Sequence, residues 1–199
     1  MGDALCNRFA PPEWRQWDER WHRREVDLAS AQREMWRMVH TTPDAFNAAI
    51  DELGVLRPGL TDLLDAAEAA DIPVVIASGG FEYYIRRLLA AHLHRFAAIY
   101  ANEMRLVDGG IEVNFPHVGH VSCAADAVCK GAVIDAYEGP VIFCGDGSSD
   151  RCALGKADTL FVVEGSRLEA RAREEGVACT PFSDFRSVIF ALRQAEEAV

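Results

Sequence analysis

Three short apolar runs in the later part of the chain constrain its fold more than any other feature. They span residues 74–77 (VVIA), 141–144 (VIFC) and 160–163 (LFVV), and turn-forming residues bound each of them. Continuous rather than alternating hydrophobicity is typical of strands that are covered on both faces. Segments with helical periodicity separate the runs, and strands that alternate with helices form a mostly parallel sheet. The sequence therefore predicts an α/β fold.

From residue 11 to about residue 54 the chain follows a different, helical pattern. Trp14, Trp17 and Trp21 are spaced as on one helix face, and Thr42 before Pro43 is typical of a helix start. A helix of this type must bury its apolar face, so the tryptophans are interpreted as core residues. The pattern changes after residues 57–59 (RPG). We predict a small helical domain at residues 1–55 and an α/β domain at residues 56–199, with a hairpin where residues 104–107 and 111–115 flank an Asp-Gly-Gly turn.

Composition excludes several classes of protein. Acidic residues outnumber basic ones by 31 to 20, and a net charge of -11 repels polyanions, so we expect no nucleic-acid partner. Local amides, a lysine and a metal could still bind a small phosphate ester. The six cysteines are scattered, which favours reduced thiols. We find neither an apolar run of about 20 residues nor an export signal, and expect a cytoplasmic protein without membrane contact.

A serine and two glycines follow the first apolar run. In open parallel sheets, ligands bind at the carboxyl ends of the strands. Ser78, Gly79 and Gly80 stand at such an end, before a segment with helical pattern. The glycines allow backbone amides to approach an anion closely, and the serine adds a donor. The segment is a candidate phosphate site, although Ser-Gly-Gly also occurs in ordinary turns.

The second apolar run leads into two aspartates four residues apart, Asp146 and Asp150. Carboxylates at a strand end suit a hard cation such as Mg²⁺, while the alternative is a solvated turn in which Asp150 caps the next helix. Lys130 lies between the two strand ends in a Cys-Lys-Gly sequence. A lysine ammonium is a compact charge that can hold a phosphate against carboxylates.

Taken in order, these motifs resemble those of the haloacid dehalogenase (HAD) superfamily, in its phosphoserine-phosphatase-like branch. The resemblance implies that Ser78 is the second motif, Lys130 the third, and Asp146 with Asp150 the fourth, with Asp150 acting on the metal indirectly. Residues 173–185 (REEGVACTPFSDF) resemble the tail of the methionine-salvage phosphatases, which act on 2-hydroxy-3-keto-5-methylthiopentenyl-1-phosphate. The resemblance implies a Rossmann-like core, a helical cap, a Mg²⁺ cofactor and hydrolysis of a small phosphorylated metabolite, either the methionine-salvage intermediate or phosphoserine.

The family's first motif, Asp-x-Asp-x-Thr/Val after the first strand, has no counterpart in this sequence. The resemblance implies that its first aspartate attacks phosphorus, and that its strand lies between the strands that end at Ser78 and Cys144. We therefore expect a mostly parallel sheet without its central first strand, and negligible turnover by this chain alone. Asp3 follows only two residues, so we expect a truncated or misassigned start rather than a true pseudoenzyme.

Other interpretations remain open. A non-catalytic pseudophosphatase that binds phosphate ligands or a protein partner is the alternative function. His117, His120, Cys123 and Cys129 could bind zinc by residue type, but their spacing is not that of a standard zinc finger, and we favour a loop with buried thiols. Dinucleotide binding is not supported, because no G-x-G-x-x-G follows a strand. The oligomeric state is open, with a homodimer as one option.

Overall fold

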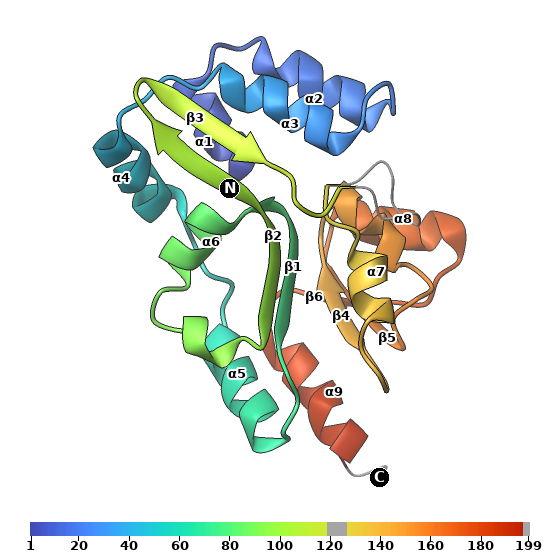
Figure 1. The fold of residues 1–199 in the computed structure, drawn as a ribbon. Helices are drawn as coiled ribbons and strands as arrows, with labels where there is room; N and C mark the ends of the chain where they lie inside the picture. The colour runs from blue at the N-terminus through green and yellow to red at the C-terminus, as the bar shows by residue number, and fades with distance from the viewer. Residues whose placement is uncertain (119–126, 197–199) are drawn as a thin grey trace. The chain divides into compact units, whose positions relative to one another are not determined.

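A computed structural model describes residues 1–118 and 127–196 and divides the chain into two compact units (Figure 1). The first unit comprises Met1–Val55, Ile76–Leu93 and, as far as it is described, Ile99–Cys129. The second comprises Leu56–Val75, His94–Ala98 and the described part of Lys130–Val199. The chain therefore crosses between the units several times.

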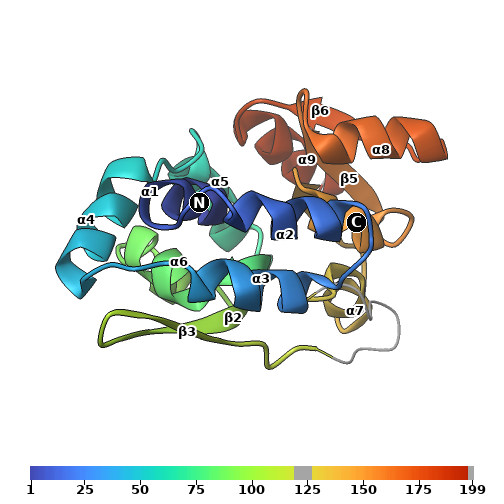
Figure 2. The same ribbon diagram turned by 90° about the horizontal axis from the view of Figure 1, so that it is seen from above.

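Short helices build much of the first unit. They are α1 (Gly2–Phe9), α2 (Trp14–His22), α3 (Leu28–Arg37), α4 (Pro43–Leu53) and α6 (Glu82–Leu88). The Asp27 carboxylate accepts a hydrogen bond from Ser30 N at 2.7 Å at the start of α3, and Thr42 caps α4 with Pro43 in its first turn. Helices α2 and α3 lie side by side (Figure 2). Helices α2, α3 and α4 lie where the sequence predicted a helical pattern, whereas α1 was not foreseen.

A three-stranded sheet completes the first unit, with the order β1 (Val75–Phe81), β2 (Ala98–Val107), β3 (Gly110–Asn114). Strands β2 and β3 pair antiparallel, with Met104 opposite Val113. Gly109 forms their turn with a φ of +77°, a conformation that favours glycine. The predicted hairpin is confirmed.

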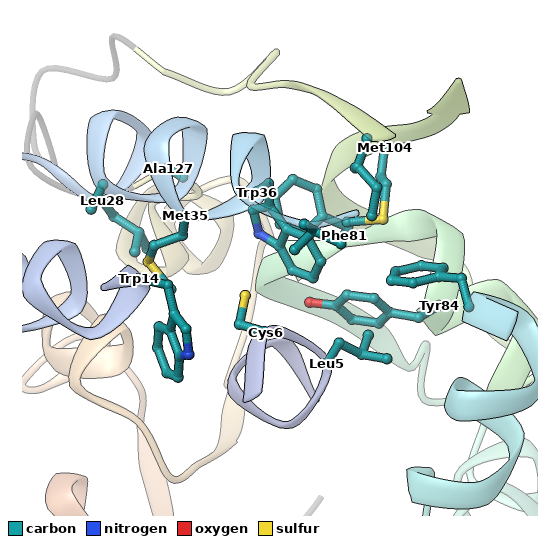
Figure 3. Packing of buried hydrophobic residues seen from close by; sticks show 14 of the residues in the cluster. Leu5, Cys6, Trp14, Leu28, Met35, Trp36, Phe81, Tyr84, Met104 and Ala127 are labelled. Atoms are coloured by element: carbon teal, nitrogen blue, oxygen red, sulfur yellow. The ribbon is translucent and has the colours of Figure 1, made fainter. Parts of the chain in front are cut away.

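Helices and sheet of the first unit share one apolar core (Figure 3). Trp36 and Phe81 are almost fully buried, and their ring centroids lie 5.3 Å apart in an edge-to-face arrangement. Leu5 and Cys6 of α1 have no exposed surface in this core, and Trp14 is buried as well. The tryptophan stripe therefore serves the core, as its periodicity predicted.

The second unit has the α/β pattern that the apolar runs predict. Its sheet has the order β4 (Ile142–Gly145), β5 (Thr159–Val163), β6 (Thr180–Phe182), and both pairs are parallel. Its helices are α5 (Leu60–Ala69), α7 (Lys130–Asp135), α8 (Arg167–Glu175) and α9 (Arg186–Glu196), with 3-10 helices at Leu93–Arg95 and Ser148–Ala153. Phe161 of β5 and Phe182 of β6 join a core with Leu63 of α5 and Val188 of α9.

The strands form two sheets rather than one. Strand β1 is the outer strand of the first sheet and β4 is the outer strand of the second. These are the strands between which the absent first strand was expected. The residues of β4 are only half-buried, whereas Leu160, Phe161 and Val162 of β5 are buried. Among the helices in the described part of the chain, none has the length and apolar character that crossing a bilayer requires.

Candidate active site

Lys130 is the centre of a buried polar cluster in the second unit. Its side chain is 1% exposed at the start of α7. The ammonium nitrogen donates to Ser149 Oγ at 2.7 Å and Ser149 O at 3.1 Å, and lies 3.1 Å from Asp150 Oδ1. An ammonium has three donors, and these three acceptors match them in number. The Lys130 cluster, which is Lys130 with Ser149 and Asp150, thus compensates a buried charge.

Asp150 also organises the turn after β4. Its second carboxylate oxygen, Oδ2, accepts from the backbone amides of Asp146 at 2.9 Å and Gly147 at 2.8 Å. A Cβ at Gly145 would come within 2.9 Å of that oxygen and 2.6 Å of the Phe143 ring, so this position requires glycine. Asp150 thus connects the lysine to the strand end.

Asp146 contrasts with Asp150. It is exposed, and within the ranges that the structure describes its carboxylate has no hydrogen-bond or ion-pair partner. Mg²⁺ is commonly held by one or two carboxylates together with waters and substrate oxygens. The exposed carboxylate of Asp146 could be a direct ligand of such an ion, whereas Asp150 could act on it only through the turn that it holds. The described residues contain no group of three or more His, Cys, Asp or Glu side chains that would enclose a metal by themselves.

Gly131 explains how α7 approaches the 3-10 helix Ser148–Ala153. A Cβ at Gly131 would lie 2.4 Å from Cys152 O, a backbone atom that cannot easily move away. The Gly131 amide faces Cys152 Sγ at 3.5 Å. The Cys-Lys-Gly sequence therefore needs its glycine to bring Lys130 close to Ser149 and Asp150.

Ser78, Gly79 and Gly80 belong to the first unit. The sequence predicted a strand ending at residue 77, but β1 continues through Phe81, and α6 begins at Glu82. Ser78 Oγ accepts a hydrogen bond from Gly80 N at 3.0 Å. A Cβ at Gly80 would meet the Tyr84 hydroxyl at 2.1 Å, so a larger residue there would displace the buried Tyr84 side chain.

Two residues that the sequence analysis missed bind this segment. Asn102 of β2 donates from Nδ2 to Gly79 O at 2.9 Å and to Gly80 O at 3.1 Å. Gln32 of α3 donates from Nε2 to Gly79 O at 3.1 Å. A signal for Asn102 existed, because an amide follows Ala98–Ala101 in a segment that is otherwise apolar or aromatic.

The structure brings Lys130, Asp146 and Asp150 together within the second unit, whereas Ser78 lies in the first. Burial raises the pKa of the Cys144 thiol, which precedes this turn, to about 12, so the thiol stays protonated near neutrality and is a poor nucleophile. Of the candidate zinc ligands, His120 and Cys123 lie outside the described residues. His117 packs edge-on against Tyr100, with ring centroids 6.0 Å apart, and Cys129 is buried.

Comparisons with known proteins agree with the resemblance that the motifs indicated. Residues 5–155 match the family described as haloacid dehalogenase-like hydrolase. A 2-hydroxy-3-keto-5-methylthiopentenyl-1-phosphate phosphatase of Brevibacillus brevis is 24% identical over 202 residues, which cover 98% of this chain and 90% of the relative. The phosphatase of the same name from Bacillus cereus is 25% identical over 191 residues, with 93% and 85% covered.

Solved structures show the same fold. A probable phosphoserine phosphatase of Vibrio cholerae superposes with a TM-score of 0.66 at 20% identity, covering 94% of this chain and 58% of that one. A substrate-bound phosphoserine phosphatase gives a TM-score of 0.65 at 16% identity, with 90% and 84% covered. A HAD family hydrolase of Salmonella enterica gives 0.63 at 19% identity, and this chain spans 57% of its length. The predicted α/β class is thereby confirmed.

Proposed function

Because the chain belongs to the haloacid dehalogenase-like hydrolase family, we propose that it serves in the hydrolysis of a phosphomonoester of a small metabolite. The observation that carries the proposal is the Lys130 cluster. Its buried ammonium forms an ion pair with Asp150, and Asp150 also accepts a hydrogen bond from the backbone amide of Asp146, whose carboxylate is exposed. A cation and carboxylates at one strand end suit a phosphate ester with its metal. The relatives named as methionine-salvage phosphatases favour that pathway's phosphate ester as substrate, with phosphoserine as the second candidate.

Each motif has a role in this proposal. In the first unit, Ser78, Gly79 and Gly80 offer a serine hydroxyl and backbone amides to phosphoryl oxygens. In the second unit, Lys130 offers an ammonium that can neutralise the charge of a phosphate. Lys130 already has three acceptors, so to bind phosphate it must exchange one of them, and the Ser149 hydroxyl, which can rotate, is the one most easily exchanged. Asp150 keeps the ammonium in place during that exchange.

Mg²⁺ is the proposed cofactor, with Asp146 as its ligand and Asp150 acting indirectly. When bound, the ion neutralises charge on the transferring phosphoryl group. A carboxylate nucleophile of the family type would form an aspartyl-phosphate, which water then hydrolyses. Asp150 is unsuited to that role, because both its oxygens are engaged with Lys130 and two amides. We therefore propose that turnover depends on the Asp-x-Asp motif that these 199 residues lack.

A phosphate-release assay tests the proposal. The 199-residue protein and a version preceded by a strand carrying the family's Asp-x-Asp-x-Thr motif are incubated with Mg²⁺ and a panel of phosphate esters. We expect release only from the extended version, and its loss in the extended Asp146→Asn variant. Release by the 199-residue protein would show that another residue attacks phosphorus.

A non-catalytic phosphate-binding protein is the second candidate, and the missing nucleophile motif favours it. The same assay separates the two candidates. If the extended version binds inorganic phosphate but hydrolyses no ester, the pseudophosphatase is favoured. If Asp146→Asn leaves hydrolysis unchanged, the proposed metal role is wrong.

A further inference from the structure

Asn102 is a fully buried polar side chain whose hydrogen bonds all serve the Ser-Gly-Gly segment (residues 78–80). It has no exposed surface. Its amide nitrogen carries two hydrogens, and these go to two consecutive carbonyls, Gly79 O and Gly80 O. Both acceptors are carbonyl oxygens, so the nitrogen of the side-chain amide must face them. The Asn102 oxygen, Oδ1, has no partner within the described ranges. Burying an asparagine with an unpaired oxygen is costly, and its two donated bonds must offset that cost.

The two bonds fix the direction of backbone amides. In a trans peptide the N–H points opposite to the C=O of the same unit, so holding Gly79 O sets the direction of Gly80 N–H. That N–H donates to Ser78 Oγ at 3.0 Å, so the restraint on Gly79 O is passed on to the serine hydroxyl. Glycines without such restraint sample many more backbone conformations. Hydrogen bonds to the carbonyls also polarise the peptide units and strengthen their N–H groups as donors.

Gln32 adds a restraint from a second element. Its Nε2 reaches Gly79 O at 3.1 Å from α3, and its own amide oxygen is likewise buried without a partner in the described part of the chain. Gly79 O therefore accepts hydrogen bonds from two side-chain amides, one on α3 and one on β2. No other backbone carbonyl in the described ranges has two side-chain amide donors.

We propose that Asn102, assisted by Gln32, is a positioning residue: through the Gly80 amide it holds the Ser78 oxygen of the Ser-Gly-Gly segment, so that the serine O–H donates to a phosphoryl group. This inference rests on the proposed function, because it takes that segment to be a phosphate site. It adds a structural requirement that none of the phosphatase motifs contains. Loss of the Asn102 donors should weaken phosphate binding while the core around Phe81 remains folded.

The test is a titration of the ¹⁵N-labelled protein with inorganic phosphate, followed through the backbone amides of Gly79, Gly80 and Phe81. In Asn102→Asp, an ionised carboxylate would face the two carbonyl oxygens and repel them. We expect about tenfold weaker phosphate binding near neutral pH, which corresponds to the loss of about one hydrogen bond. As pH falls, the new carboxyl group is protonated and regains one donor, so the affinity ratio to the unaltered protein should recover.

The matched control is Asn114→Asp, since Asn114 donates to Glu103 on the exposed hairpin, 2.9 Å away. It should bind phosphate within about twofold of the unaltered protein. A purely structural role for Asn102 would lower thermal stability without a pH-dependent affinity ratio. Circular dichroism at each pH confirms that the variant is folded, and if Asn102→Asp does not fold, Asn102→Ser, which keeps one donor, replaces it with an expected loss of about threefold.

The outcomes separate the two proposals. If the unaltered protein binds phosphate and the folded Asn102 variant binds it equally well, the positioning role is wrong and the phosphate site stands. If the unaltered protein shows no saturable shift at these amides, the phosphate site is wrong and the positioning role falls with it. Weaker binding in the Asn102 variant with normal binding in Asn114→Asp supports both.

Discussion

At the residue scale, the Lys130 cluster is stable mainly because the buried charges of Lys130 and Asp150 compensate each other. Replacing Lys130 by Met keeps the volume but leaves Asp150, itself only 7% exposed, without its cation. Asp150 retains its two amide donors, so we expect a loss of about 3 kcal/mol of unfolding free energy, at the low end for a broken buried pair. Urea unfolding measures this loss. Arg173→Met is the control: it removes a surface partner of Glu169 from a side chain 79% exposed, and should cost less than about 1 kcal/mol. Equal losses in both variants would contradict the burial argument.

Gly131 provides a second prediction at this scale. Gly131→Ala places a methyl group 2.4 Å from Cys152 O, so either α7 or the 3-10 helix must shift. We expect a loss of about 2 kcal/mol, as for other overpacked sites. Gly110→Ala is the control, because its added methyl group meets only Val39 O at 3.8 Å. Thermal unfolding of the two variants decides; a Gly131→Ala protein as stable as Gly110→Ala would show that the helices are not in tight contact.

At the scale of elements, the sequence predicted those features of helices and turns that depend on neighbouring residues. The Thr42-Pro43 start of α4, the helical stripes and the Asp-Gly-Gly hairpin were all predictable, because caps, periodicity and turn residues act within a few positions. The end of β1 was predicted too early, since the pairing of Gly79 and Gly80 with Asn102 depends on a residue 22 or 23 positions away. Helix α1 was missed because only Leu5 and Cys6 of its eight residues are buried, which is too weak a stripe to recognise.

The cap of α4 gives a prediction for an element. Thr42 Oγ1 accepts from Ala45 N at 3.3 Å, a long bond at an exposed helix start. Thr42→Ala should therefore cost about 1 kcal/mol of stability in the first unit. Thr41→Ala is the neighbouring control, since the Thr41 hydroxyl donates only to Thr42 O and caps no helix. Urea unfolding that gives the same free energy for both variants would exclude a capping role.

At the scale of the whole molecule, the two units can be followed separately. All four tryptophans, from Trp14 to Trp36, lie in the first unit, so tryptophan fluorescence reports its unfolding, whereas far-UV circular dichroism reports both. Lys130, Asp146 and Asp150 lie in the second unit. If the units unfold separately, the loss of stability in Lys130→Met should appear in circular dichroism but largely not in tryptophan fluorescence. If the units unfold as one cooperative body, both signals should report the same loss.

The same fluorescence signal tests how the first unit responds to alkali. Burial, aided by the negative charges of Asp3 and Asp18, raises the pKa of the Cys6 thiol from 9.0 to about 12. The folded protein therefore holds this proton more tightly than the unfolded chain. The resulting stability is fully present below pH 9 and is lost as pH rises from 9 towards 12, by at most about 1.4 kcal/mol per pH unit. Cys6→Ala removes the thiol, at the cost of a cavity that is the same at every pH. Urea unfolding at pH 7, 9 and 10.5 should therefore show a lower unfolding free energy for Cys6→Ala at pH 7, but a shallower decline of that free energy as pH rises. Parallel declines in the two proteins would mean that the Cys6 thiol does not titrate with unfolding.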